Sequence, residues 1–178
     1  MKLKGKKVAI LLEQQFQDLE VWYPALRLRE DGADVIFVGA GASDYKGKYG
    51  YPAKAHTQIE KVKADDLDAL IVPGGWAPDF LRRNEKVLKL VQEMDQRGKV
   101  IGAICHAGWV LVSADVLADR TVTCFSAIKD DVVNAGAKFV DQEVVVDGNL
   151  VTSRTPEDLP AFCRELIGVL SKSSPPVV

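Results

Sequence analysis

Short and almost uninterrupted runs of aliphatic residues recur along the chain, at positions 7–12, 34–38, 68–72 and 100–104. A strand that is covered on both faces has this pattern, because neither of its faces meets water. The segments between the runs place apolar residues three and four positions apart, which is typical of amphipathic helices. Strands that alternate with helices predict a three-layer α/β fold with a mostly parallel sheet.

The first helical segment follows the first predicted strand. Asp18 can cap this helix, and the apolar residues Leu19, Trp22, Leu26 and Leu28 fall at helical spacing within it. Further elements are expected as a helix at 85–97, a strand at 121–125, a helix at 127–134, a hairpin at 144–152 and a final helix at 155–170.

Length and composition narrow the class of protein. A chain of 178 residues is expected to form one domain over residues 1–171, with a flexible tail at 172–178. The net charge of −2 argues against nucleic acid or an anionic membrane as the main partner. No apolar run approaches the ~18 residues that cross a bilayer, and no signal-peptide pattern precedes the first strand. Three cysteines without a scaffold spacing favour a reducing compartment, so we expect a cytoplasmic protein.

Cys105 directly follows the strand pattern at 100–104 and is itself followed by His106, Ala107 and Gly108. A cysteine in this place can be a small residue of the core. Alternatively, small residues after it allow a sharp turn from strand to helix, as in the nucleophile elbow of hydrolases. The amides of a first helical turn favour negative charge, so we expect the pKa of the Cys105 thiol to be lowered.

Glu20 and Gly75 also lie just after predicted strands. The carboxyl ends of parallel strands share one edge of the sheet, where α/β proteins hold their sites. Glu20 either compensates the helix dipole or forms a hydrogen bond with the Cys105 sulfur. The Gly74–Gly75 turn offers a backbone amide to an oxyanion. His106 can act as a general base or acid near neutral pH, although the ring of a neighbouring residue need not point at the sulfur.

Other polar and glycine-rich segments give weaker signals. His56 and His106 are the two histidines, and no ligand spacing surrounds them, so we expect no metal. The loop at 39–52 lacks the G-x-G-x-x-G fingerprint and is interpreted as a surface loop or a subunit contact, so we expect no organic cofactor. Cys124 and Cys163 lack the context of an elbow and are expected to be inert buried thiols.

Several ordered motifs resemble those of the ThiJ/PfpI superfamily, with closest similarity to its branch of PfpI-type intracellular proteases and stress proteins. They are F-Q-D-L-E (16–20), D-A-L-I-V-P-G-G (68–75), A-P-D (77–79), A-I-C-H (103–106), S-A-D-V-L (113–117), D-G-N-L-V-T-S-R (147–154) and T-P-E-D-L-P-A-F (155–162). The resemblance covers residues 6 to about 170. It implies a flavodoxin-like sandwich of the class I glutamine amidotransferase type.

The resemblance also implies roles for individual residues. Cys105 matches the nucleophile, Glu20 the protonated glutamate that holds the thiolate, and His106 the histidine of a Cys-His-acid triad. Asp79 matches an acid that reaches the histidine of a neighbouring subunit, so the site is completed in an oligomer. The main-chain amides of Gly75 and His106 match the oxyanion hole.

Three further residues are placed at the pocket, namely Gly74, Trp76 and Gln17. Gln17 stands where many members have a glutamate, which removes one acid near the mouth. Trp76 occupies a position that is often polar or smaller, so it narrows the pocket or gives it an aromatic wall. Ala107–Gly108 replaces the usual turn after the histidine.

The resemblance implies a cysteine-nucleophile hydrolase of carbonyl centres that acts in stress protection, either as a glyoxalase- or deglycase-like enzyme or as a peptidase. Nothing indicates an extended peptide groove, so we favour the first. The substrates are then small carbonyl compounds or glycated proteins and peptides, with nucleic acid only as a repair substrate. The alternative is a non-enzymatic oxidative-stress sensor or chaperone in which Cys105 is oxidised. In either case we expect a homo-oligomer, which is at least a dimer, with a hexamer as the alternative.

Overall fold

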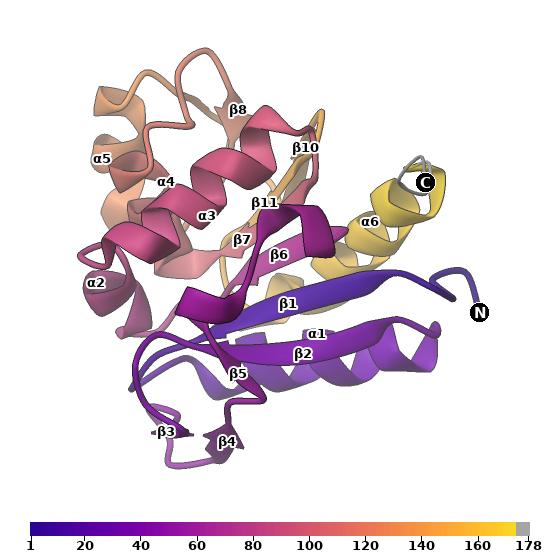
Figure 1. Cartoon of the computed structure of the whole chain (residues 1–178). Coiled ribbons are helices and arrows are strands. Elements are labelled where there is room, and N and C mark those ends of the chain that lie inside the picture. The colour runs from indigo at the N-terminus through magenta and orange to yellow at the C-terminus, as the bar shows by residue number, and fades with distance from the viewer. Residues whose placement is uncertain (174–178) are drawn as a thin grey trace.

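A twisted seven-stranded sheet forms the centre of the molecule. The structure, a computed structural model, describes residues 1–173, and Figure 1 shows the whole chain. The strand order is β10-β11-β7-β6-β1-β2-β5, and every neighbouring pair is parallel except the hairpin β10–β11. These strands are β1 (Lys7–Leu12), β2 (Asp34–Gly39), β5 (Thr57–Gln58), β6 (Ala69–Val72), β7 (Val100–Ile104), β10 (Val144–Asp147) and β11 (Leu150–Ser153).

Helices cover both faces of the sheet, as the aliphatic strand pattern predicts. In Figure 1, α1 and α6 lie on one side of the sheet, and α2 to α5 lie on the other. The helices are α1 (Asp18–Glu30), α2 (Ala77–Leu81), α3 (Glu85–Gln96), α4 (Gly108–Ser113), α5 (Lys129–Asn134) and α6 (Leu159–Lys172). Every residue of β6, β7 and β11 is buried between these layers. Within residues 1–173, no helix is long and apolar enough to span a bilayer.

Short strands and single 3-10 turns lie outside the main sheet and the helices. Two small antiparallel strands, β3 (Asp44–Lys46) and β4 (Pro52–Lys54), form a hairpin within and beyond the glycine-rich loop. β8 (Thr121–Val122) and β9 (Lys138–Phe139) form a parallel pair beside the main sheet. Single 3-10 turns occur at η1 (Ile59–Lys61), η2 (Ala64–Asp66), η3 (Cys105–Ala107), η4 (Ser126–Ile128) and η5 (Pro156–Asp158).

Most predicted elements are present, but two boundaries were wrong. The strand expected at 121–125 stops after two residues, because the chain then leaves β8 toward the end of β7, where the Phe125 N–H donates to the Cys105 carbonyl. The last helix begins as a 3-10 turn and continues to Lys172, beyond the expected end at 170. Of the flexible tail expected at 172–178, residues 174–178 lie outside the described residues.

The start of α1 also differs from the prediction. Gln17, not Asp18, is the N-cap, and its side-chain oxygen accepts a hydrogen bond from the Glu20 N–H. The Asp18 carboxylate instead accepts hydrogen bonds from the backbone N–H groups of Tyr49 and Tyr51, at 3.0 and 2.9 Å. The first turn of α1 therefore fixes the loop between β3 and β4.

The outer face of α1 is unexpectedly apolar. Of the four apolar residues at helical spacing, Leu28 is fully buried, whereas Leu19 and Leu26 are 56% and 60% exposed. The inward face is formed by smaller residues such as Val21 and Ala25. Helical spacing alone thus identified the helix but not the face that meets the sheet.

The hydrogen bonds of Asp18 generate a stability prediction. Asp18→Ala removes two charge-assisted hydrogen bonds to the β3–β4 loop and is expected to lower the free energy of unfolding by about 2 kcal/mol. Urea unfolding measures this change. Asp34→Ala, at the exposed start of β2, is the matched control and is expected to cost less than about 0.5 kcal/mol. Equal losses in the two variants would contradict the assignment.

Candidate active site

Cys105 lies at a sharp turn between β7 and α4. Its φ is +62°. This left-handed conformation is unfavourable for any residue that has a side chain. The turn needs small neighbours, since a Cβ on Gly108 would lie 2.9 Å from Ile128 Cδ1. Cys105 itself is 8% exposed. The structure thus has the elbow that the sequence predicts, including the small residues that replace the usual turn.

The loops after β1 and β6 are joined to each other beside this elbow. Phe16 and Gly75 form an isolated antiparallel bridge, and the Gln17 N–H donates to the Gly74 carbonyl at 3.1 Å. Gly75 has a φ of +77°, and a Cβ there would lie 2.4 Å from the Gln17 nitrogen. A Cβ on Gly74 would lie 2.7 Å from Cys105 Cβ. Both glycines are therefore required for the close approach of the loops.

Glu20 projects from the first turn of α1 into this junction and is completely buried. Its Oε2 accepts a hydrogen bond from the Gly74 N–H at 2.7 Å. Its other oxygen, Oε1, has no hydrogen-bond partner within residues 1–173. The carboxyl and the Cys105 thiol flank Gly74, and each shifts the pKa of the other. The carboxyl thus lies beside the thiol, and its hydrogen bond with the Cys105 sulfur stays a prediction.

Burial sets the protonation state of Glu20. Removal from water raises its pKa to about 8, although the hydrogen bond from Gly74 acts in the opposite direction. At neutral pH the carboxyl is therefore mostly protonated. A protonated carboxyl can donate its O–H to an anionic sulfur, which an ionised carboxylate cannot do.

The expected lowering of the Cys105 pKa was wrong. Burial raises the pKa of this thiol to about 12, and the negative charge of an ionised Glu20 adds to the rise. The N–H groups of His106 and Gly75 act in the opposite direction, because they donate toward the sulfur. Desolvation outweighs these dipoles, so the resting group is a thiol. A base must then remove its proton when the sulfur attacks.

His106 is placed to be that base. Its Nδ1 lies 3.3 Å from Cys105 Sγ, so the ring does point at the sulfur. Burial and the positive charge of Lys48 lower the pKa of His106, which keeps the imidazole neutral at pH 7. A neutral imidazole whose Nδ1 faces a thiol can accept its proton.

Three aromatic side chains surround the His106 ring. Phe125 stacks on it with centroids 4.8 Å apart, Trp109 meets it edge-on at 5.2 Å, and Trp76 lies at 6.0 Å. Trp109 is anchored by a hydrogen bond to Asp131. The sequence prediction included Trp76 but missed Phe125 and Trp109. Trp109 follows His106 by three residues, a helical spacing that could have indicated it, whereas Phe125 comes from a loop that only the fold brings to the ring.

The elbow opens into a cavity of about 360 Å³, which suits a small molecule. Its walls include Cys105, His106, Gly75 and the predicted pocket residues Gln17 and Trp76. Gly74 lies behind these walls, between Glu20 and Cys105, rather than on the surface of the cavity. Glu20, which was also predicted, lines the cavity as well. The sequence prediction missed the remaining lining residues, which are Leu19, Lys48, Tyr49, Phe125, Pro156 and Glu157.

Asp79 does not reach His106 within the chain. It lies on α2 with a side chain that is 55% exposed, and it pairs with Arg83 on the same helix at 3.5 Å. Within residues 1–173, the hydrogen bonds of the His106 ring include none to a carboxylate. The predicted triad is thus not formed by one copy of the chain.

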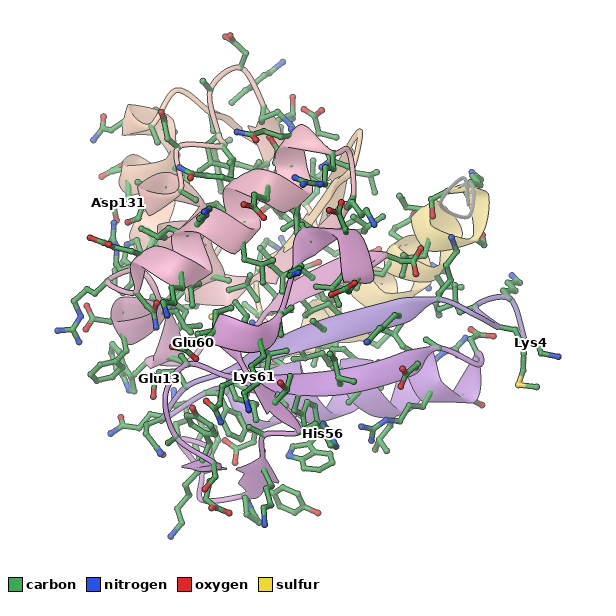
Figure 2. The ribbon with its side chains drawn as sticks, in the orientation of Figure 1. Lys4, Glu13, His56, Glu60, Lys61 and Asp131 are labelled. Carbon is green, nitrogen blue, oxygen red and sulfur yellow. The ribbon has the colours of Figure 1, made fainter. Side chains whose placement is uncertain are left out.

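The remaining candidates lie elsewhere. His56 is at the edge of the sheet near β5 (Figure 2), where its Nδ1 accepts a hydrogen bond from the Phe37 N–H at 2.7 Å and its ring stacks on that of Phe37. This contact supports a structural role. Cys124 and Cys163 are buried, and burial raises the pKa of each thiol to about 12.

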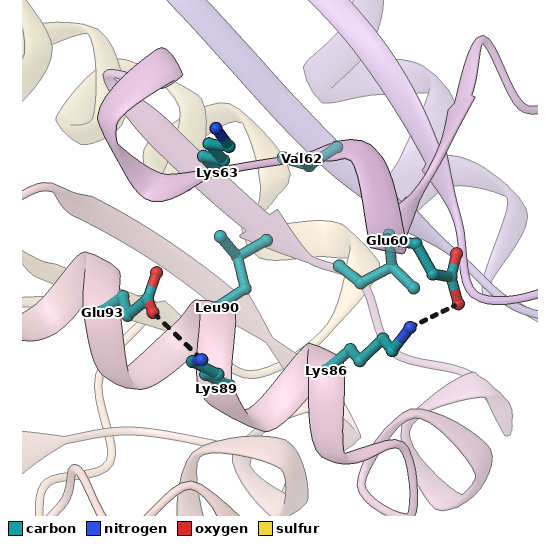
Figure 3. Close-up of a pocket in the computed structure, with 8 residues that line it drawn as sticks. Glu60, Val62, Lys63, Lys86, Lys89, Leu90 and Glu93 are labelled. Atoms are coloured by element: carbon teal, nitrogen blue, oxygen red, sulfur yellow. Dashed lines mark ion pairs between the residues drawn. The ribbon is translucent and has the colours of Figure 1, made fainter.

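A second hollow lies between η1 and α3 (Figure 3). It is smaller, about 300 Å³, and lysines and glutamates line much of it. Lys86 pairs with Glu60 at 3.7 Å and Lys89 with Glu93 at 3.9 Å. Its lining includes neither a thiol nor an imidazole, so this hollow holds neither the predicted nucleophile nor a predicted base.

Comparison with known proteins agrees with this geometry. The DJ-1/PfpI family matches residues 6–168. The chain belongs to the DJ-1/PfpI family. It is 43% identical over 164 residues to a deglycase of Pyrococcus horikoshii, covering 92% of this chain and 99% of that protein. It is 44% identical over 169 residues to the protein/nucleic acid deglycase 2 of Escherichia coli, covering 93% of this chain and 98% of that one.

Solved structures of the family share the fold. A two-domain protein of Anabaena variabilis, with DJ-1/ThiJ/PfpI-like and ferritin-like domains, superimposes with a TM-score of 0.91 at 41% identity, covering 93% of this chain and 48% of that one. Drosophila melanogaster DJ-1beta superimposes with a TM-score of 0.88 at 27% identity, covering 94% and 91%. The predicted family and flavodoxin-like fold are therefore confirmed.

The burial of Glu20 generates a prediction on stability against pH. In the unfolded chain Glu20 ionises near its ordinary pKa of 4.5, but in the folded protein only near 8. Between these values the unfolded state binds fewer protons, so stability falls as pH rises, by about 3 kcal/mol from pH 5 to pH 8. The side chain in Glu20→Gln cannot ionise, so the stability of this variant is expected not to show this decrease. Urea unfolding of both proteins at the two pH values tests it, and identical pH dependences would contradict it.

Proposed function

We propose that this protein is a cysteine-nucleophile hydrolase of the PfpI type that acts as a deglycase, with Cys105 as nucleophile and His106 as base. The observation that carries the proposal is the junction of three groups in one small cavity. A thiol at a left-handed turn faces an imidazole nitrogen at 3.3 Å and adjoins a buried carboxyl that is protonated at neutral pH. Relatives that share 43% and 44% of their residues with this chain are named deglycases.

The arrangement suits attack on a carbonyl-derived adduct of an amine. In the adduct of methylglyoxal, R–NH–CH(OH)–CO–CH₃, Cys105 displaces the amine, His106 takes the thiol proton and the amine receives it. A proton shift within the bound fragment oxidises the carbon on sulfur to a thioester and reduces the neighbouring ketone to an alcohol. Water then releases lactic acid and restores the thiol. The sum is adduct plus water to amine plus hydroxy acid, with no external oxidant.

Each polar group of the site has a place in this sequence. The N–H groups of Gly75 and His106, which donate toward the sulfur, stabilise negative charge on sulfur or on an adjacent oxygen. The protonated Glu20 donates to the thiolate once His106 has taken its proton. The small cavity favours a compact carbonyl fragment over an extended peptide, which is why a deglycase is proposed rather than a peptidase.

The substrate class follows from the same chemistry. Small carbonyl compounds, such as methylglyoxal itself, and glycated proteins or peptides present the reacting carbon at an exposed end. A glycated nucleic acid presents it in the same way and is proposed only as a repair substrate. A role in stress protection and a cytoplasmic location complete the proposal, the latter because the three cysteines are free thiols.

Replacement of the nucleophile tests the function. Cys105→Ala is expected to lower the release of lactate from methylglyoxal, and from a methylglyoxal-treated peptide, by at least about 100-fold, because neither Cys124 nor Cys163 lines this cavity. Cys163→Ala, on α6, is the matched control and is expected to keep the wild-type rate. Equal consumption of methylglyoxal by wild type and Cys105→Ala overturns the proposal. So does selective peroxide oxidation of Cys105 to sulfinic acid in a wild-type protein without turnover, which the sensor alternative predicts.

We further propose that the site is completed in a homo-oligomer, in which Asp79 of a second copy contacts His106. Support comes from the exposed surface of α2, where Asp79 lies between Trp76 and Phe80, which are 50% and 42% exposed. A base that is surrounded by aromatic rings benefits from one fixed acceptor, which holds its ring in the reactive orientation.

Asp79→Asn tests this assembly. The variant keeps the shape of the side chain but loses its charge, so kcat/KM is expected to fall about tenfold as the orientation of His106 relaxes. Glu85→Gln, a nearby exposed acid at the start of α3, is the control and is expected to keep full activity. Sedimentation at assay concentrations measures the assembly. An active monomer, or an Asp79→Asn variant as active as the wild type, contradicts the proposal.

A further inference from the structure

One cation stands at the mouth of the cavity, on a loop that is held firmly. Lys48 lies between β3 and β4, and its N–H donates to the Phe16 carbonyl at 2.8 Å. The loop packs closely against α1, because a Cβ on the adjacent Gly47 would lie 2.3 Å from Asp18 Oδ1. The backbone of Lys48 is thus fixed beside the Phe16–Gly75 bridge.

The side chain of Lys48 extends over the aromatic wall of the cavity. Its Nζ lies 5.2 Å from the ring centroid of Tyr49 and 5.9 Å from that of Trp76. Both rings line the same cavity as Cys105 and His106. The side chain is exposed, and none of the ion pairs within residues 1–173 includes it. Its charge is therefore not neutralised by a neighbouring carboxylate.

This charge reaches the reacting groups. The positive charge of Lys48 lowers the pKa of Glu20 and of His106. The negative charge of Glu157, the other acidic residue of the lining, raises the pKa of Glu20. With Glu20 protonated and His106 neutral, a substrate in the cavity meets one cation and one anion, both at the mouth. Because Lys48 and Glu157 have opposite charges, their neutral variants are expected to have opposite effects on a charged reagent.

We propose that Lys48 is a specificity-determining residue, which favours substrates that carry a carboxylate next to the glycated group. The inference rests on the proposed deglycase function and narrows its substrate class to acidic amine adducts, such as those on the amino group of glycine or at acidic segments of proteins. An unpaired ammonium at the entrance raises the local concentration of anions at the sulfur. The hydroxy acid product has the same charge, so Lys48 also contacts it before release.

Alkylation of Cys105 tests Lys48 without any turnover. Iodoacetate and iodoacetamide react with the same sulfur and differ by one negative charge, so the ratio of their rates removes changes in the pKa of the thiol. Lys48→Met is expected to lower the iodoacetate-to-iodoacetamide ratio by about three- to tenfold. Lys48→Arg is expected to keep the ratio, and Glu157→Gln to raise it. Mass spectrometry after proteolysis measures alkylation at Cys105.

Turnover of paired adducts tests the substrate class. Methylglyoxal adducts of the amino groups of glycine and of glycinamide serve as substrates, and Lys48→Met is expected to raise the ratio of the KM for the acid to the KM for the amide about three- to tenfold. An alkylation ratio that is the same in wild type and Lys48→Met overturns the role of Lys48. A ratio that falls as expected, in proteins that turn over neither adduct, supports carboxylate recognition by Lys48 and overturns the deglycase function alone.

Discussion

The packing of the buried Glu20 carboxyl against the backbone of Gly74 determines the geometry of the site. Glu20 is completely buried, and a Cβ on Gly74 would lie 2.5 Å from its Oε2. The same Cβ would collide with Cys105, so the absence of one side chain lets two others meet. These residues follow β1, β6 and β7, which are adjacent at the centre of the sheet. The parallel arrangement of the strands thus brings all three to one edge.

The electrostatics of the site follow from this exclusion of water. The raised pKa of Glu20 and of the Cys105 thiol, and the lowered pKa of His106, all describe groups that burial holds in their neutral forms. In the proposed mechanism charge is separated only when the sulfur attacks, and the donors around it are then already in place. A neutral resting site also protects the sulfur from adventitious oxidants, since the thiolate is the form that reacts with them.

Much of the fold, and the centre of the site, could be predicted from the sequence. Strands buried on both faces leave aliphatic runs, and Cys105 follows one of them directly. The outward position of Leu19 and Leu26 could not be predicted, because helical spacing identifies a face but not what covers it. The predicted lowering of the Cys105 pKa was wrong for a similar reason, since desolvation depends on residues distant in sequence. Lys48 and Phe125 enter the site from separate loops and carry no local signal.

At the left-handed turn of Cys105, selection for stability and selection for activity favour different residues. A side chain at φ +62° costs roughly 1–2 kcal/mol, which glycine would not incur. A search for more stable versions of this protein would therefore tend to replace the residue that we propose as the nucleophile. Thermal stability is consequently a poor guide to activity among variants of this turn. Libraries aimed at robustness should hold position 105 constant and seek their gains in the layers of helices.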